Sequence, residues 1–326
     1  MLAGALALLM VGLWSAGDPV QGQVAQSQTA QSLAADPQAV KPTFKAGVEL
    51  VRITAVVRDR RGRPVLGLSR SDFQLNVNGE RVPILEFESD ASGVSLAVLV
   101  DSSGSMRLAG RMEAAREIVD HMVRCVESGR DEVALLSFDR NLRTVHPFTA
   151  APLEVLPQLG ELQPYGMTSL YDAIADAARP LVDRKRPRRA VLVVTDGIDN
   201  GSLLSPPEVS RIASEIDVPV YVVAIRVGAD RIGGMPATGA VLDPESQATL
   251  EDLANWTGGE TFMAGTPAET ALVVQQILAE LRHQYLIAFE ASPRAGWHPL
   301  SIGMRKKNLS VRARGGYMTG TSSGLL

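Results

Sequence analysis

The feature that most constrains the fold is an apolar run, residues 94–100, that ends in the polar sequence Asp-Ser-Ser-Gly-Ser. A helical pattern follows from Met106. An apolar run of this length that ends in turn residues is typical of a strand buried on both faces of a parallel sheet. Three oxygen-bearing side chains, Asp101, Ser103 and Ser105, alternate where the strand ends. Because ligands of open α/β sheets bind beyond the carboxyl ends of the strands, this position predicts a metal or anion site.

Strands and helices alternate from residue 93 to residue 283. Apolar and β-branched runs predict buried strands at residues 94–100, 132–138, 190–195, 218–227 and 260–263, with a short edge strand at 142–145. Apolar periodicity predicts helices at 106–127, 153–162, 170–182, 250–256 and 267–283, and a Ser-Pro-Pro-Glu start predicts another from residue 205. This order predicts an α/β fold with a doubly wound, mostly parallel sheet flanked by helices.

Two β segments flank this α/β domain. Residues 45–92 carry β-branched runs and the hairpin signal Asn78-Gly79, and residues 284–318 carry three further runs with strand character. Neither segment has enough strands to bury a core alone. We therefore expect both segments to form one small β-sandwich-like module, with the domain of residues 93–283 inserted between its halves.

The two ends of the chain are predicted to lie outside these folded parts. Residues 1–22 contain an apolar run shorter than the roughly 20 residues of a spanning helix, which favours a signal peptide, with a retained N-terminal anchor as the alternative. Residues 23–44 predict a flexible linker, and residues 319–326 a disordered tail. The sequence thus predicts an exported protein, in the periplasm, at the cell surface or outside the cell. Membrane contact is expected only through an uncleaved N-terminal segment.

Charge, cysteine and histidine content argue against several classes of function. The net charge is −4 and the pI is about 5.7, so composition indicates no nucleic-acid partner. The one cysteine, Cys125, cannot form an intrachain disulfide, and we expect it to be a buried small apolar residue. The four histidines form no HExxH or His-x-x-x-His pair, so a zinc site with imidazole or thiolate ligands is not expected.

Three loops at one edge of the predicted sheet supply oxygen ligands. The first carries Asp101, Ser103 and Ser105, the second carries Thr168, and the third carries Asp196. Oxygen donors select hard cations, of which we expect Mg²⁺, with Mn²⁺ or Ca²⁺ as alternatives. With two carboxylates and three neutral hydroxyls, a bound divalent ion keeps residual positive charge and an open coordination position. The set therefore predicts an ion that accepts an Asp or Glu carboxylate from a protein partner.

These motifs resemble those of a known family. Asp-Ser-Ser-Gly-Ser at 101–105, Gly-Met-Thr at 166–168 and Thr-Asp-Gly at 195–197 are similar to the metal-ion-dependent adhesion site of von Willebrand factor type A domains. The resemblance covers residues 94–283, and the flanks further resemble bacterial secreted "VWFA-related" proteins. It implies that Ser103, Ser105 and Thr168 ligate Mg²⁺ directly, while Asp101 and Asp196 act directly or through metal-bound waters. It also implies an adhesion or assembly module that is not an enzyme.

Other polar residues of these loops lie beside the expected ligands. We expect Ser102, Met167 and Asp199 to border the ion and to contact the partner, although Asp199 has the alternative role of ending its loop. Asp172, on the helix after Thr168, is expected to be a solvated or capping acid. The basic run at residues 184–189 precedes a strand at the opposite end of the sheet. We expect a solvated turn there, with contact to anionic lipid or polysaccharide as the alternative.

Other functions remain open for the same residues. The Asp-Ser-Ser-Gly-Ser sequence alone could cap a helix, but a cap does not account for Thr168 and Asp196. A metal-dependent hydrolase could use Asp101 as nucleophile or ligand, although aspartyl nucleophiles of phosphotransferases usually have a second carboxylate where Ser103 stands. Neither Ser103 nor Ser105 fits the Gly-x-Ser-x-Gly pattern of a serine hydrolase. A third function is a scaffold whose ion is structural and whose partner surface is the β module.

Overall fold

The computed structural model describes residues 49–320, apart from 90–91, 198, 227–230, 233–234 and 237–243. The chain divides into two compact units, residues 1–46 and 47–326, and the following concerns the second. The predicted signal peptide, the predicted linker and residues 321–326 of the predicted tail lie outside the described residues. Within the described part, no helix is both long enough and apolar enough to cross a membrane.

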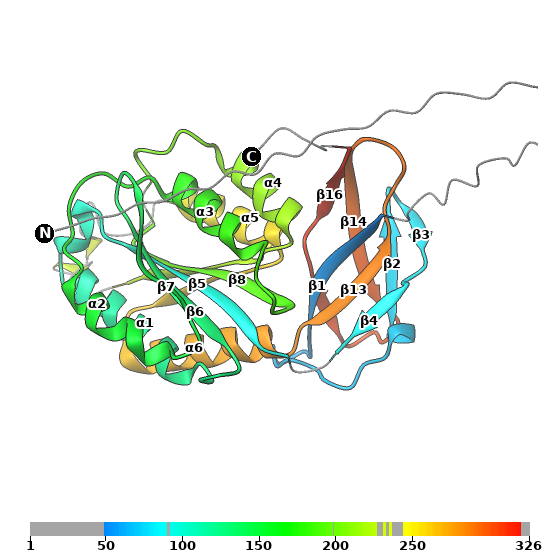
Figure 1. Cartoon of the computed structure of the whole chain (residues 1–326), viewed down its shortest axis with the longest axis horizontal. Coiled ribbons are helices and arrows are strands. Elements are labelled where there is room, and N and C mark those ends of the chain that lie inside the picture. The colour runs from blue at the N-terminus through cyan, green and yellow to red at the C-terminus, as the bar shows by residue number, and fades with distance from the viewer. Residues whose placement is uncertain are drawn as a thin grey trace, which may run out of the picture. The chain divides into compact units, whose positions relative to one another are not determined.

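A six-stranded sheet forms the centre of the α/β domain (Figure 1). Its order is β12-β9-β8-β5-β6-β7, and every pairing is parallel except that of β7 with β6. The strands are β5 (Val94–Asp101), β6 (Glu132–Phe138), β7 (Leu142–Thr149), β8 (Arg188–Thr195), β9 (Val220–Ile225) and β12 (Thr261–Ala264). The predicted fold class is therefore confirmed, and β5 lies in the interior of the sheet with all eight of its residues buried.

Helices cover both faces of this sheet (Figure 1). Alternate residues of β5 point to opposite sides, so Val98 packs with one group of helices and Leu99 with the other. The first group is α1 (Arg111–Cys125), α2 (Leu156–Glu161) and α6 (Pro267–Arg282), and the second is α3 (Leu170–Ala178), α4 (Pro206–Ile216) and α5 (Pro244–Thr257). This two-layered cover explains why the strands read as continuous apolar runs.

Several predicted helices differ in length from the observed ones, and two of these differences have a cause in the backbone. The helix expected from Met106 begins only at Arg111, after a 3₁₀ turn at Gly104–Arg107, because Ala109 and Gly110 have positive φ and interrupt the helical path. The helix expected to reach residue 182 ends at Ala178 and continues as a 3₁₀ turn, Arg179–Leu181. Pro180 has no backbone N–H to donate to the preceding turn.

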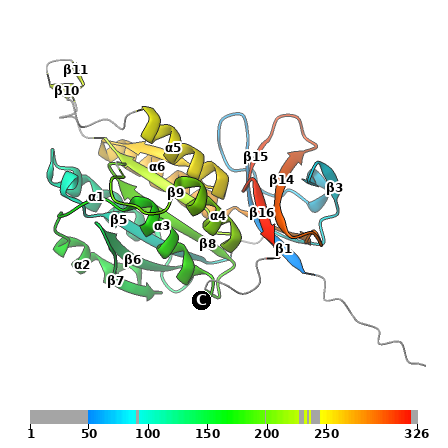
Figure 2. The same ribbon diagram turned by 90° about the horizontal axis from the view of Figure 1, so that it is seen from above.

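The two flanks form a pair of four-stranded sheets, which we call the β module (Figures 1 and 2). One sheet has the order β15-β1-β13-β4, with β15 (Ser310–Arg312), β1 (Leu50–Arg58), β13 (Tyr285–Glu290) and β4 (Glu86–Glu88). The other has the order β16-β14-β2-β3, with β16 (Gly316–Thr319), β14 (Gly296–Met304), β2 (Phe73–Val77) and β3 (Glu80–Val82). Each sheet combines strands from both flanks, so neither flank has a sheet of its own.

The core of the β module is closed by aromatic side chains. Phe73 of one sheet lies 5.2 Å from Tyr285 of the other, measured between ring centroids, and both rings are buried. The sequence did not predict β16, because this strand is short, residues 316–319, and begins with a glycine. Gly316 lies against the Trp297 ring, where an added Cβ would approach to 2.2 Å, so a glycine is needed for this edge strand to pair with β14.

A largely buried cluster of four charges joins the β module to the α/β domain. Arg58 of β1 and Arg312 of β15 each form ion pairs with Glu260 and with Glu280 of α6. Glu280 is fully buried, and the Nη1 of Arg58 lies 3.1 Å from the Oε1 of Glu260. Because α6 also packs on the central sheet, the cluster fixes two strands of the module to a core helix of the domain.

The basic run before β8 is not the solvated turn that we expected. Arg188 is fully buried and donates to the carbonyl of Gln284 at 3.0 Å. Arg184 binds Glu132 through two hydrogen bonds of 2.7 and 2.6 Å, and Arg186 lies 2.7 Å from the same carboxylate. These arginines therefore link the start of β8 to neighbouring elements, while Lys185 is exposed.

Candidate metal centre

The three predicted loops meet at the carboxyl ends of β5 and β8. Asp101 ends β5, Asp196 directly follows β8, and Thr168 stands two residues before α3. Backbone hydrogen bonds connect the first two loops: Gly104 N–H donates to the Gly166 carbonyl at 2.9 Å, and Tyr165 N–H donates to the Ser102 carbonyl at 2.7 Å. The structure thus brings together the five expected ligands from separate parts of the sequence.

Asp101 is fixed at the base of the centre. Its Oδ1 accepts from the Ser103 N–H at 2.8 Å, and its Oδ2 accepts from the Thr195 hydroxyl at 2.6 Å. The hydroxyls of Ser103 and Ser105 lie 3.0 Å apart. Burial, together with the negative charge of Asp196, raises the pKa of Asp101 to about 6. A cation bound here would offset both effects and favour the carboxylate form.

Thr168 is held by the loop that follows β8. The Thr168 N–H donates to the Asn200 Oδ1 at 2.8 Å, and its carbonyl accepts from the Asn200 N–H at 3.0 Å. Asp199 accepts from the Leu170 N–H at 2.8 Å, which satisfies an end group of α3. The loops that carry Thr168 and Asp196 are therefore positioned by each other.

A glycine makes this contact possible. An added Cβ at Gly201 would lie 2.8 Å from the Ser169 Oγ and 3.3 Å from the Thr168 carbonyl oxygen. We expect Gly201→Ala to displace the Thr168 loop and to weaken Mg²⁺ binding roughly tenfold, at a cost in stability of no more than about 2 kcal/mol. Calorimetric titration with Mg²⁺ measures the first effect and denaturant unfolding the second. Gly160→Ala is the control, because no atom lies within 4 Å of its added Cβ; equal Mg²⁺ affinities in the two variants would contradict this role for Gly201.

Asp196 has one paired and one unpaired oxygen. Its Oδ2 lies 2.8 Å from the Nη1 of Arg111, and both side chains are almost completely buried. Its Oδ1 is buried and has no hydrogen-bond partner among the described residues. An unsatisfied buried carboxylate oxygen is costly, so it indicates a place for a cation or a water bound to one.

Arg111 is a site residue that the sequence analysis missed. An arginine at the start of an amphipathic helix is usually taken to face solvent. The helical spacing could have predicted its burial. Arg111 lies four residues before Ala115 and seven before Ile118, so it shares the buried face of α1 with them. Its guanidinium places one positive charge beside the candidate metal centre.

The residues fit a hard divalent cation. Every candidate donor is oxygen, two hydroxyls adjoin each other, and Asp196 offers an unpaired oxygen to the centre. Among the described residues there is no group of three or more His, Cys, Asp or Glu side chains that could hold a metal. The candidate centre therefore depends on hydroxyls, and its ligands would be Ser103, Ser105 and Thr168, with Asp101 and Asp196 completing it.

The three expected partner-contact residues have different environments. Met167 is 46% exposed beside Thr168, as a contact residue would be. Ser102 is 2% exposed, and its hydroxyl donates to the Phe138 carbonyl at 2.9 Å, so our expectation of direct contact is wrong for its side chain. Asp199 is partly buried and is engaged with the start of α3, the loop-ending role that we gave as its alternative. Asp172 likewise caps the loop after β8 by accepting from the Leu203 and Leu204 N–H groups.

Arg111 leads to a prediction about ion affinity. In Arg111→Met, removal of a unit charge a few ångströms from the ion is worth on the order of 1–4 kcal/mol of Coulomb energy. We expect Mg²⁺ to bind at least about tenfold more tightly than to the wild type, and the metal-free variant to unfold at a lower temperature because Asp196 loses its partner. Thermal unfolding with and without Mg²⁺ checks both effects, since the stabilisation by Mg²⁺ should then be larger in the variant. A smaller stabilisation would contradict this account of Arg111.

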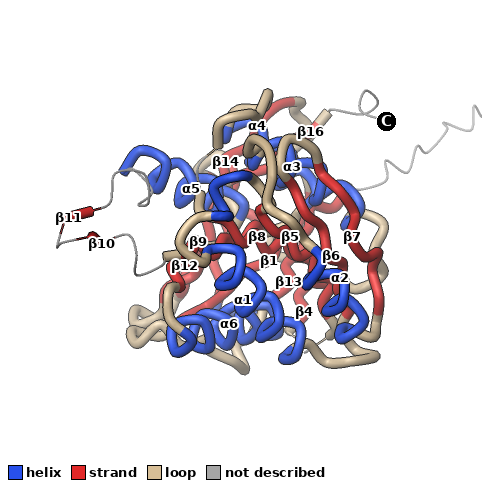
Figure 3. The backbone as a smooth tube through the Cα atoms, turned by 90° about the vertical axis from the view of Figure 1, so that its left-hand side faces the viewer, coloured by secondary structure: helices blue, strands red, loops and turns tan. Residues whose placement is uncertain are grey.

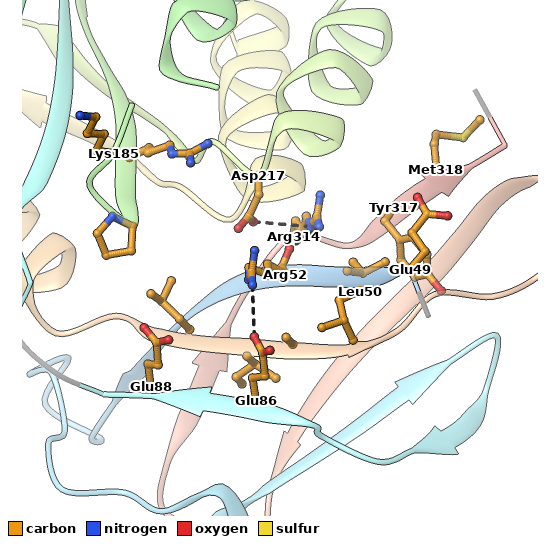
Figure 4. A pocket seen from close by; sticks show the side chains of 16 residues that line it. Glu49, Leu50, Arg52, Glu86, Glu88, Lys185, Asp217, Arg314, Tyr317 and Met318 are labelled. Carbon is orange, nitrogen blue, oxygen red and sulfur yellow. Dashed lines mark hydrogen bonds and ion pairs between the residues drawn. The ribbon is translucent and has the colours of Figure 1, made fainter. Parts of the chain in front are cut away.

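A separate cavity of about 520 Å³ lies between the β module and the α/β domain (Figure 4). Its walls carry both signs of charge: Arg52 pairs with Glu86 at 3.3 Å, and the buried Arg314 lies 3.7 Å from Asp217. Burial raises the pKa of Asp217. Residues at the start of β8 line this cavity, whereas the candidate metal centre follows the end of β8. The two sites are therefore distinct.

Comparisons with known proteins give one family match, which covers part of the α/β domain. Residues 96–198 match the model of the von Willebrand factor type A domain family. No curated protein matches the chain. Similar solved structures include BatB from Bacteroides thetaiotaomicron, with 21% identity, a TM-score of 0.46 and coverage of 57% of this chain and 98% of that one.

Two further solved structures are similar to this chain. A von Willebrand factor type A protein from Catenulispora acidiphila has 13% identity, a TM-score of 0.48 and coverage of 85% of this chain and 76% of that one. The vWF domain of the type V pili tip protein Mfa5 from Porphyromonas gingivalis has 11% identity, a TM-score of 0.43 and coverage of 58% of this chain and 96% of that one.

Proposed function

The chain carries a von Willebrand factor type A domain, and we propose that this domain binds a protein partner through a divalent ion. The ion, Mg²⁺ in preference to Mn²⁺ or Ca²⁺, is held by Ser103, Ser105 and Thr168, with Asp101 and Asp196 completing the centre. A carboxylate of the partner takes an open coordination position. The protein acts as an exported adhesion or assembly module, in keeping with the apolar segment at residues 1–14.

The observation that carries this proposal is the charge balance of the centre. Asp101 and Asp196 supply two negative charges, and Arg111 already neutralises one through its ion pair with Asp196. A divalent ion added to this set leaves a net positive charge of about one in a largely buried place. Such a centre favours an anionic ligand from outside, which a partner's Asp or Glu side chain supplies.

Binding is favoured over hydrolysis by the partners of the serine hydroxyls. A nucleophilic serine needs a general base within hydrogen-bond reach. The Ser103 hydroxyl lies 3.0 Å from the Ser105 hydroxyl and also hydrogen-bonds to the Asp101 carboxylate, which accepts from the Thr195 hydroxyl as well. This carboxylate is therefore shared by two hydroxyls and stands among the expected metal ligands, so a bound cation would compete with its use as a base. A scaffold with a structural ion is the remaining alternative, and it predicts no dependence of partner capture on the metal.

Affinity capture tests the proposal with the full exported chain. We expect the wild type to retain a protein partner in Mg²⁺ and to release it in EDTA, and Thr168→Ala to retain none in either condition. Asp120→Asn is the matched control, because Asp120 is a partly exposed acid in the C-terminal half of α1, where it pairs with Arg124. Capture that survives EDTA and the Thr168 substitution would contradict the proposed function.

A further inference from the structure

Four large apolar side chains around the candidate metal centre are exposed. Leu203 is 94% exposed, Tyr165 72%, Leu108 59% and Met167 46%. Isolated exposed apolar residues are common, but these four belong to the same three loops that supply the ligands. We call these four side chains the collar.

The collar residues are held near one another by contacts between the loops. Arg107 donates to the Pro164 carbonyl at 2.7 Å, and its guanidinium carbon lies 5.9 Å from the centroid of the Tyr165 ring. The site for a Cβ on Gly201, two residues before Leu203, lies 3.6 Å from the Met167 Cβ. These loops lie at the edge of the sheet that faces the viewer in Figure 3, and the four exposed apolar side chains belong to them.

Two arginines of the loops at this edge are exposed, Arg107 and Arg140. The exposed Glu113 of α1 lies 3.7 Å from Arg116, and other nearby carboxylates are buried or engaged. Asp139 is 8% exposed and pairs with Arg143, and Asp172 accepts from two backbone N–H groups. A surface of apolar side chains and arginines around a positively charged centre complements an acidic, apolar ligand and rejects a basic one.

A cavity of about 420 Å³ continues from the collar. It is lined by Arg140, Leu142, Ser169, Gly201 and Leu203, together with Asp172, Ala173, Asp176 and Asn141. Ser169 adjoins Thr168 in sequence, so the cavity begins beside the centre. Its size is in the range of sites that accept one or a few side chains.

We infer that the ligand is a protein segment in which one acidic residue is flanked by apolar residues. Its carboxylate meets the ion, and its apolar neighbours lie on the collar, one of them against Leu203 at the mouth of the cavity. This inference rests on the proposed function, because the collar surrounds the ion. It adds the sequence character of the partner, which the ion alone does not select.

Two labelled peptides test the inference by fluorescence anisotropy with the full chain. In one peptide an aspartate lies between leucines, and in the other it lies between glycines and serines. In Mg²⁺ we expect the leucine-flanked peptide to bind at least roughly tenfold more tightly. Replacing the aspartate of the leucine-flanked peptide by asparagine should abolish binding, and so should the addition of EDTA.

Variants of the chain separate the collar from the ion. Leu203→Ser combined with Leu108→Ser should remove the preference for leucine flanks while leaving the Mg²⁺ affinity of the free protein unchanged. Leu272→Ser, at an apolar residue of α6 that is 68% exposed, is the control and should change neither. Equal binding of the two aspartate peptides would contradict the proposed role of the collar but not the proposed function. Absence of Mg²⁺-dependent binding for both peptides would overturn the proposed function as well.

Discussion

Asp101→Asn should reduce Mg²⁺ affinity by at least about a hundredfold while the protein stays folded. The substitution keeps the shape of the side chain and removes one of the two negative charges of the centre. The amide oxygen of asparagine can still accept from the Ser103 N–H, and its amide nitrogen can donate to the Thr195 hydroxyl, which now donates to the carboxylate. Isothermal titration of Mg²⁺ into the full chain measures the loss.

The buried position of Asp101 makes the accompanying stability change informative. Burial and Asp196 raise its pKa to about 6, so without metal the ionised form is costly in the folded state. The metal-free asparagine variant should therefore be at least as stable as the wild type at neutral pH, and only the wild type should gain stability from added Mg²⁺. If Mg²⁺ stabilises both proteins equally, Asp101 is not part of the centre that binds it.

Glu280→Ala should cost about 3–5 kcal/mol of unfolding free energy, the range found when one partner of a buried ion pair is removed. The substitution leaves Arg58 and Arg312 sharing Glu260 alone, and both guanidiniums are largely buried. Glu280 itself is fully buried. Denaturant unfolding gives the free energy.

Two controls identify the cause of this loss. Glu290→Ala removes an exposed acid at the end of β13 and should change stability by less than about 0.5 kcal/mol. Replacing Glu280 and Arg312 together by leucine should recover part of the loss, because one unpaired charge is removed with its partner. A double variant less stable than Glu280→Ala would show that the cluster does not act through unpaired charge.

Local patterns were sufficient to predict the central domain and the meeting of the three loops that carry the five expected ligands. Strands buried on both faces leave continuous apolar runs, and the residues that end β5 and β8 follow those runs directly, as Asp101 and Asp196 do. Residues at the ends of parallel strands meet at one edge of a sheet, so the meeting of three loops followed from the order of elements. The same reasoning placed Thr168 before α3.

Features that depend on side-chain pairing across the fold could not be predicted in the same way. Arg111, Arg188 and Arg312 look like solvent-facing residues in the sequence, and each is buried only because a carboxylate or carbonyl from a distant segment meets it. Ser102 was misplaced for a related reason. Its partner, the Phe138 carbonyl, belongs to the neighbouring strand β6, and no local sequence pattern predicts the register between β5 and β6.

The most direct test of the central claim is a crystal structure of the full chain grown with Mn²⁺, with anomalous differences recorded at the manganese edge. Mn²⁺ has the ligand preferences of the proposed ion and can be located directly from its anomalous scattering. We predict one strong anomalous peak within coordination distance of the hydroxyl oxygens of Ser103, Ser105 and Thr168, and no such peak in Asp101→Asn. A wild-type crystal with no peak at these hydroxyls, or with its strongest peak elsewhere, would contradict the account.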